Sequence, residues 1–72
     1  MDIEWKEGSS IRMTIKNGEA LISANRNGLL SLASQLRALA DEKQGSHIHY
    51  DAYNALEDGS DDLIIELVGE TE

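Results

Sequence analysis

Two alternating segments around Asn17-Gly18 constrain the fold more than any other feature of this sequence. In the stretch IRMTIKNGEALIS, residues 11–23, apolar and polar side chains alternate before the turn. A period of two predicts a strand with one buried face. Asn-Gly is favoured in two-residue hairpin turns because both residues tolerate positive φ. The pattern therefore predicts a β-hairpin with strands at 11–16 and 19–24.

The N-terminal stretch DIEWK also alternates, with Ile3 and Trp5 set between charged residues. We expect a first strand at 2–6, joined to the hairpin by the turn signal EGSS. The three strands would then form an antiparallel meander at the start of the chain.

After the hairpin, the hydrophobic period becomes that of an amphipathic helix. Apolar residues at i, i+3, i+4 and i+7 predict a helix at 27–43. Asn25 or Asn27 is expected to cap its N-terminus, and Gly45 its C-terminus. The stripe expected to face the sheet consists of Leu29, Leu32, Ala33, Leu36, Leu39 and Ala40.

Two further strands are predicted in the C-terminal half, one in SHIHYD at 46–51 and one in DDLIIELV at 61–68. The connection AYNALEDGS between them is rich in turn residues. A sheet with one apolar face needs a cover, which a helix with one apolar stripe supplies. We therefore expect one α+β domain over residues 1–72. It would be a two-layer sandwich, a largely antiparallel sheet of four to five strands covered by one helix, in the order (β)ββ-α-ββ.

Composition narrows the class of protein. The 72 residues include no cysteine, which excludes disulfides and thiolate zinc ligands and favours a reducing cytoplasm. No apolar run approaches the roughly 20 residues of a membrane span, and the N-terminus lacks a signal-peptide pattern. We therefore expect no membrane partner.

The net charge of −8 is unevenly distributed along the chain. Residues 1–40 carry five bases and four acids, a net +1, whereas residues 41–72 carry one base and ten acids, a net −9. Phosphate backbones are repelled by such a C-terminal half, so we expect no nucleic-acid partner. A basic protein partner would be attracted and its encounter accelerated. A purely solubilising role of the acids is the simpler alternative.

His47, His49 and Asp51 occupy alternate positions of one predicted strand. They are expected to project to one face, while Ile48 and Tyr50 fill the core. The two imidazoles could share a zinc ion with Asp51, but no cysteine or third histidine is present as a fourth ligand. The solvated face of a half-buried strand is the simpler interpretation, and we predict neither a metal nor another cofactor.

The same segment does not predict an enzyme. Ser46, His47 and Asp51 are residue types of a nucleophilic triad, but they are nearly contiguous in one strand. This placement does not align nucleophile, base and orienting acid, and so small a domain has little room for a pocket of ~300 Å³. A metal-dependent hydrolase fragment built on the histidines would need a further ligand.

An acidic cluster is formed by Glu57, Asp58, Asp61 and Asp62 in the last connection. Its spacing is not that of an EF-hand loop, so calcium is not expected. The simpler interpretation is a solvated turn around Gly59, and the functional one is an acidic surface that meets cationic side chains of a partner. Tyr53 lies beside these acids and is the aromatic residue best suited to be an exposed anchor.

Three segments follow one another in the chain: NGLLSLASQLRALA, then GSHIHYD, then NALEDGSDDLIIE. In this order they resemble a family of small bacterial immunity proteins of polymorphic-toxin systems, immunity-protein family thirty-two, over about residues 17 to 67. The positions that coincide with the family pattern are Gly28, Leu29, Leu30, Leu32, Ala33, His47, His49, Asp51, Leu56, Glu57, Gly59 and Ser60.

The resemblance implies a cytoplasmic antidote that binds a cognate toxin, often a nuclease or another hydrolase. Our hypothesis is non-covalent, stoichiometric inhibition through an acidic surface. The candidate contact residues are His47, His49, Asp51, Tyr53, Glu57, Asp58, Asp61 and Asp62. A different class stays open, namely a small homo-oligomeric structural or accessory domain without a toxin partner. Edge strands of its sheet would offer a route to a homodimer.

Overall fold

The computed structural model describes residues 3–69, with two strands, one helix and two further strands in chain order. The bounds are β1 Ile11–Lys16, β2 Glu19–Ala24, α1 Arg26–Ala40, β3 His47–Tyr50 and β4 Leu63–Glu66. β1 pairs antiparallel with β2, and β3 antiparallel with β4, in two separate two-stranded sheets. The α+β class with one helix is confirmed, whereas the single sheet of four to five strands is wrong.

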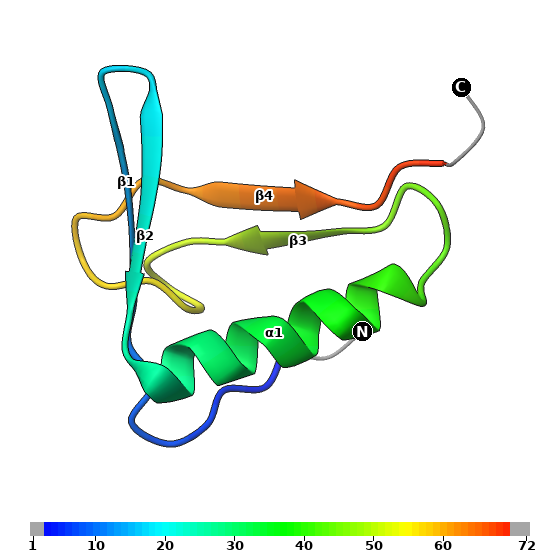
Figure 1. Ribbon diagram of the computed structural model, residues 1–72, viewed down its shortest axis with the longest axis horizontal. Coiled ribbons are helices and arrows are strands. Elements are labelled where there is room, and N and C mark those ends of the chain that lie inside the picture. Colours follow the sequence, from blue (N-terminus) through cyan, green and yellow to red (C-terminus); the bar gives the residue numbers. More distant parts are fainter. Residues whose placement is uncertain (1–2, 70–72) are drawn as a thin grey trace.

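A loop, and not a third strand, occupies the outer edge of β1. Four hydrogen bonds of 2.8 to 3.2 Å join the backbone of β1 to segment 57–61. They run from Glu57 N to Ile11 O, from Asp61 N to Met13 O, from Met13 N to Ser60 Oγ and from Ile15 N to Asp61 Oδ2. A third strand would need these same backbone groups, so none can be added here. The hairpin therefore stands across one end of the β3–β4 sheet (Figure 1).

The predicted hairpin is confirmed in detail. Lys16 lies opposite Glu19, and the two residues between them have positive φ, 54° at Asn17 and 80° at Gly18. This is the conformation that a type I′ turn requires. The alternation of β1 holds at Ile11 and Met13, which are buried in the core, but not at Ile15, which is 56% exposed.

The strand expected at 2–6 is wrong for the residues described, since residues 3–6 form no strand, and Asp2 lies outside the described range. The helix, not a strand, supplies the partners of this segment. Lys6 N donates to Ser31 Oγ at 2.8 Å, and Gln35 Nε2 donates to Glu4 O at 2.8 Å. Polar side chains on α1 thus satisfy backbone groups that strand pairing would otherwise satisfy.

The helix is shorter at its end than the predicted 27–43. Asn25 caps its start, with the side-chain oxygen accepting from Gly28 N at 2.8 Å. Asp41 is the C-cap, and its N–H donates to Ala38 O in a tightened last turn. Gly45 is therefore not the cap; its φ of 95° serves the connection that leads into β3.

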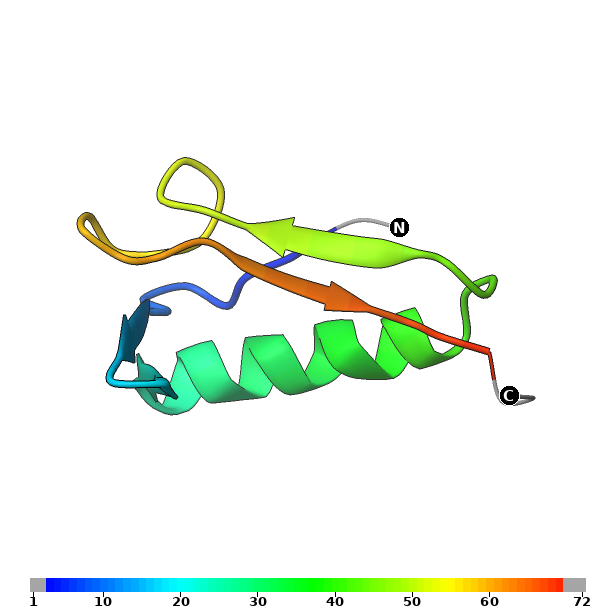
Figure 2. The ribbon, with the colours of Figure 1, turned by 90° about the horizontal axis from the view of Figure 1, so that it is seen from above.

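The buried face of α1 differs from the predicted stripe. It comprises Gly28, Ser31, Leu32, Gln35 and Leu39. Four residues of the predicted stripe are exposed, namely Leu29, Ala33, Leu36 and Ala40. The reason is that α1 covers a narrow two-stranded sheet and turns a polar strip toward the N-terminal segment. Figure 2 shows α1 running along one face of β3 and β4. The core between these layers consists of Ile11, Met13, Leu32, Leu39, Ile48, Tyr50 and Leu56.

Candidate functional site

The outer face of β3 and β4, on the side away from α1, presents both histidines. His47 and His49 are exposed, while Ile48 and Tyr50 between them are buried, as the alternation predicted. In the antiparallel register His47 lies opposite Glu66, and His49 lies opposite Ile64. Cross-strand partners share a face of the sheet, so these four side chains form one surface.

His49 contacts one of the acids of the last connection. Its Nε2 lies 3.2 Å from Asp62 Oδ2, and both side chains are exposed. An exposed pair of this kind contributes about 0–1 kcal/mol to stability. The contact joins the outer face of β3 and β4, called the histidine face below, to the acidic cluster. It leaves both the imidazole and the carboxylate exposed.

Asp51 does not join the histidines, because β3 ends at Tyr50. Its Oδ1 accepts from Tyr53 N at 2.9 Å and from Asn54 N at 3.1 Å. Asn54 returns two bonds: its Oδ1 accepts from Asp51 N, and its Nδ2 donates to His49 O. Asp51 is thus part of a hydrogen-bonded turn that holds residues 51–54 in place.

Tyr53 projects from this turn and is 99% exposed. Leu56 attaches this turn to the core, because its side chain is buried and its N–H donates to Asp51 O at 2.9 Å. A large aromatic side chain is therefore presented to solvent by a fixed backbone.

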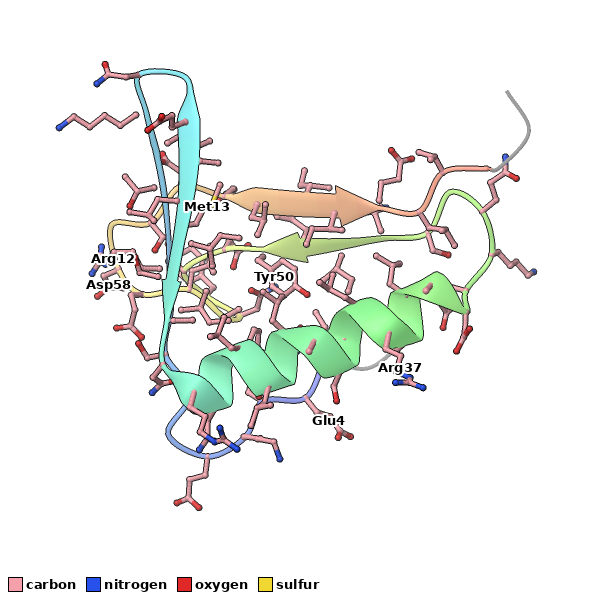
Figure 3. The ribbon with its side chains drawn as sticks, viewed as in Figure 1. Glu4, Arg12, Met13, Arg37, Tyr50 and Asp58 are labelled. Carbon is pink, nitrogen blue, oxygen red and sulfur yellow. The ribbon has the colours of Figure 1, made fainter. Side chains whose placement is uncertain are left out.

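The four acids of the cluster are all exposed, but they have different roles. The Asp61 carboxylate accepts from Ile15 N at 2.8 Å and so belongs to the edge of β1. Asp58 accepts from Arg12 Nη1 through its backbone oxygen at 3.0 Å, a contact at the side of the hairpin in Figure 3. Within residues 3–69, no hydrogen bond reaches the carboxylates of Glu57 or Asp58, so these two are available to a partner.

Ile64 is a surface residue that the sequence interpretation did not single out. It is 60% exposed and lies on the same face as His49. The alternation in DDLIIELV was the signal, since it places Ile64, Glu66 and Val68 opposite the partly buried residues of the strand. An apolar side chain at the centre of a polar face is a typical feature of a contact surface.

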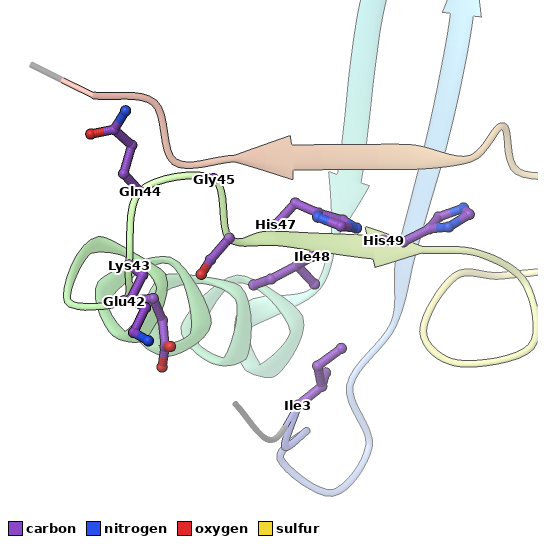
Figure 4. A pocket seen from close by; sticks show the side chains of 9 residues that line it. Ile3, Glu42, Lys43, Gln44, Gly45, His47, Ile48 and His49 are labelled. Atoms are coloured by element: carbon purple, nitrogen blue, oxygen red, sulfur yellow. The ribbon is translucent and has the colours of Figure 1, made fainter.

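An open groove of about 580 Å³ follows the edge of β3 that is not paired with β4. It is lined by Ile3 and residues 42–49 (Figure 4). The groove is larger than the size of the chain led us to expect. Ser46, His47 and His49 are among its polar lining residues.

Residues 3–69 contain neither a metal-binding cluster nor a membrane-spanning helix. No three side chains of the histidine, cysteine, aspartate and glutamate types gather where they could hold a metal ion. In the same part of the chain, no helix combines the length and the apolar character that crossing a bilayer requires.

Comparison with known protein families decides the class. The sequence model of the family described as Immunity protein 32 matches residues 19–68. The chain belongs to this family. Comparisons with curated proteins and with solved structures gave no match.

Membership in Immunity protein 32 gives the chain an immunity function in general, with a toxin as the general kind of partner. The match starts at β2 and ends beyond β4, so it includes α1, the histidine face and the acidic cluster. β1 and the N-terminal segment lie outside it.

Proposed function

We propose that this immunity protein neutralises its toxin in the cytoplasm by non-covalent, stoichiometric binding. The contact surface would be loop 51–62 together with the outer face of β3 and β4. The exposed Tyr53 on its hydrogen-bonded turn carries this proposal. A turn whose backbone is fixed before binding loses little backbone freedom on association, which favours the use of its exposed tyrosine as an interface anchor.

The charge around Tyr53 supports a basic partner. Glu57 and Asp58 are exposed, and residues 41–72 sum to −9, from one base and ten acids. A nuclease toxin would offer such a partner, because its substrate groove is cationic where it holds phosphate. Electrostatic attraction would then accelerate the encounter, and desolvated anchors such as Tyr53 and Ile64 would slow dissociation.

The first experiment measures affinity for a candidate toxin domain, chosen from the reading frames next to this gene. Tyr53→Ala is expected to weaken binding by about 2 kcal/mol or more, roughly 30-fold in Kd. Tyr53→Phe keeps the ring and should retain most of the affinity. Calorimetry also gives the stoichiometry, expected to be one to one. Equal affinity of the alanine variant and the natural chain would reject Tyr53 as the anchor.

The second experiment separates steering from anchoring. Glu57→Gln combined with Asp58→Asn should lower the association rate and flatten its dependence on salt, because long-range attraction is screened by ions. Asp41→Asn combined with Glu42→Gln removes the same charge at the far end of α1 and is the matched control. Asp61 is left unchanged because its carboxylate holds β1. Equal losses in both double variants would show a net-charge effect and not a local surface.

A further inference from the structure

The outer edge of β2 is an unpaired strand edge. In the hairpin register Lys16 and Glu19 close the turn as a hydrogen-bonded pair, so Ala20, Ile22 and Ala24 direct their N–H and C=O groups away from β1. The outer edge of β1 follows the same alternation, since the backbone groups of Ile11 and Met13 point away from β2 and form hydrogen bonds with segment 57–61. Within residues 3–69, no hydrogen bond reaches the outward groups of Ala20 or Ile22.

This edge also lacks the usual protection against pairing. Natural edge strands are blunted by lysine, proline, bulges or a covering loop. β2, EALISA, contains neither lysine nor proline, and its one charge, Glu19, lies at the turn. Leu21 is 59% exposed and Ile22 is 39% exposed. The contrast with β1, whose edge is covered by a loop, indicates that the β2 edge is left open for a partner.

The sequence of β2 is complementary to itself in an antiparallel arrangement. A two-fold axis at Ile22 places Ile22 opposite Ile22 of a second copy. It also places Ala20 opposite Ala24 and Leu21 opposite Ser23 of that copy. The outward N–H and C=O groups of Ala20, Ile22 and Ala24 then form hydrogen bonds with those of the second copy. No like charges face each other in this register. Such an interface is isologous, the commonest kind in homodimers.

The distribution of charge also favours a second copy of this chain as the partner of β2. Residues 1–40, which include β2, carry a net +1, from five bases and four acids. The acidic segment 57–61 lies on the far side of β1 from β2. In a sheet of order β1-β2-β2-β1 the two acidic segments would be five strand spacings apart, ~24 Å, well beyond a Debye length of about 8 Å. Figure 1 shows the turn end of the hairpin projecting beyond β4, where it can meet a second hairpin.

We propose that β2 pairs antiparallel with β2 of a second copy of this chain. The resulting four-stranded sheet joins two hairpins and leaves loop 51–62 of each copy free. This dimer does not depend on the proposed toxin-binding surface, which lies on other elements.

Sedimentation equilibrium of the full chain, from low to high micromolar concentration, tests the proposal. The expected result is a concentration-dependent rise in mass from 7.9 kDa toward twice that value. Ile22→Lys puts two ammonium groups at the two-fold axis and should weaken the dimer at least about tenfold in Kd. Ile64→Lys is the matched control, since it makes the same change at an exposed position of the other sheet.

Hydrogen exchange gives a second measurement that does not rely on a variant. The Ala20 and Ile22 amides should become protected as the concentration of protein rises, and the Ile64 amide should not. A monomer at all concentrations would overturn the proposal, as would dissociation by Ile64→Lys but not by Ile22→Lys. A third outcome would also overturn the proposal. If the natural chain is monomeric, and the Ile22→Lys variant folds but no longer binds toxin, then the β2 edge pairs with a strand of the toxin.

Discussion

At Gly28 the absence of one methyl group determines how closely the N-terminal segment approaches α1. A Cβ at this position would lie 2.5 Å from Ser10 O and 3.0 Å from Ile11 Cγ1. Because the first contact is with backbone, Gly28→Ala must displace the segment. We expect a loss of about 1–3 kcal/mol in the free energy of unfolding, despite the better helix propensity of alanine.

Urea unfolding measures this loss, and Ser34→Ala, at an exposed position of the same helix, is the control. The control should change stability by less than about 0.5 kcal/mol. A Gly28→Ala variant as stable as the natural chain would mean that the close approach has no energetic importance.

Tyr50 is a buried polar residue whose hydroxyl donates to Gln35 Oε1 at 2.8 Å. Burial raises the pKa of Tyr50 above its ordinary 10.0. The folded state therefore holds this proton more tightly than the unfolded state does, and the stability it contributes is present below pH 10 and lost as pH rises through the folded pKa. Unfolding free energy measured across the alkaline range should fall for the natural chain.

Tyr50→Phe removes the titrating group and should flatten that alkaline decline. At neutral pH the same variant leaves Gln35 Oε1 without its donor in the interior, at a cost of about 1–3 kcal/mol. Equal alkaline slopes in both proteins would assign the decline to other groups.

At the scale of elements, segment 57–61 acts as a substitute strand for β1. Asp61→Ala removes the acceptor of Ile15 N and should lower the free energy of unfolding by about 1 kcal/mol. Asp62→Ala, one residue further, removes only the exposed contact with His49 and should cost less than about 0.5 kcal/mol. Equal losses measured by urea unfolding would show that general charge, and not the edge bond, explains the effect.

At the scale of the whole molecule, a net charge of −8 on 72 residues means that repulsion among the acids lowers the free energy of unfolding. Because salt screens this repulsion, the urea midpoint should rise with sodium chloride from low to physiological ionic strength. The triple variant Asp41→Asn, Glu42→Gln, Glu66→Gln reduces the net charge from −8 to −5 and should show a smaller rise. A salt response that does not change in the triple variant would contradict repulsion as its cause.

Local signals in the sequence determined the hairpin, the helix and the faces of β3. Asn17-Gly18 fixes a turn through backbone conformation, and Asn25 caps the helix that follows it. The alternation around His47 and His49 predicts their exposure without knowledge of the partner strand. These features depend on neighbours close in the chain, so the residue pattern is sufficient to predict them.

Only the tertiary structure decided which backbone groups meet across long sequence separations. Ser60 and Asp61 occupy the edge of β1, and Ser31 and Gln35 bind the N-terminal segment, so neither place receives a strand. Hydroxyl, amide and carboxylate side chains compete with backbone for the same hydrogen bonds, and no hydrophobic period records the outcome. For this reason the sequence alone predicted one broad sheet and a misplaced helix face, while the folded chain has two narrow sheets and an open edge at β2.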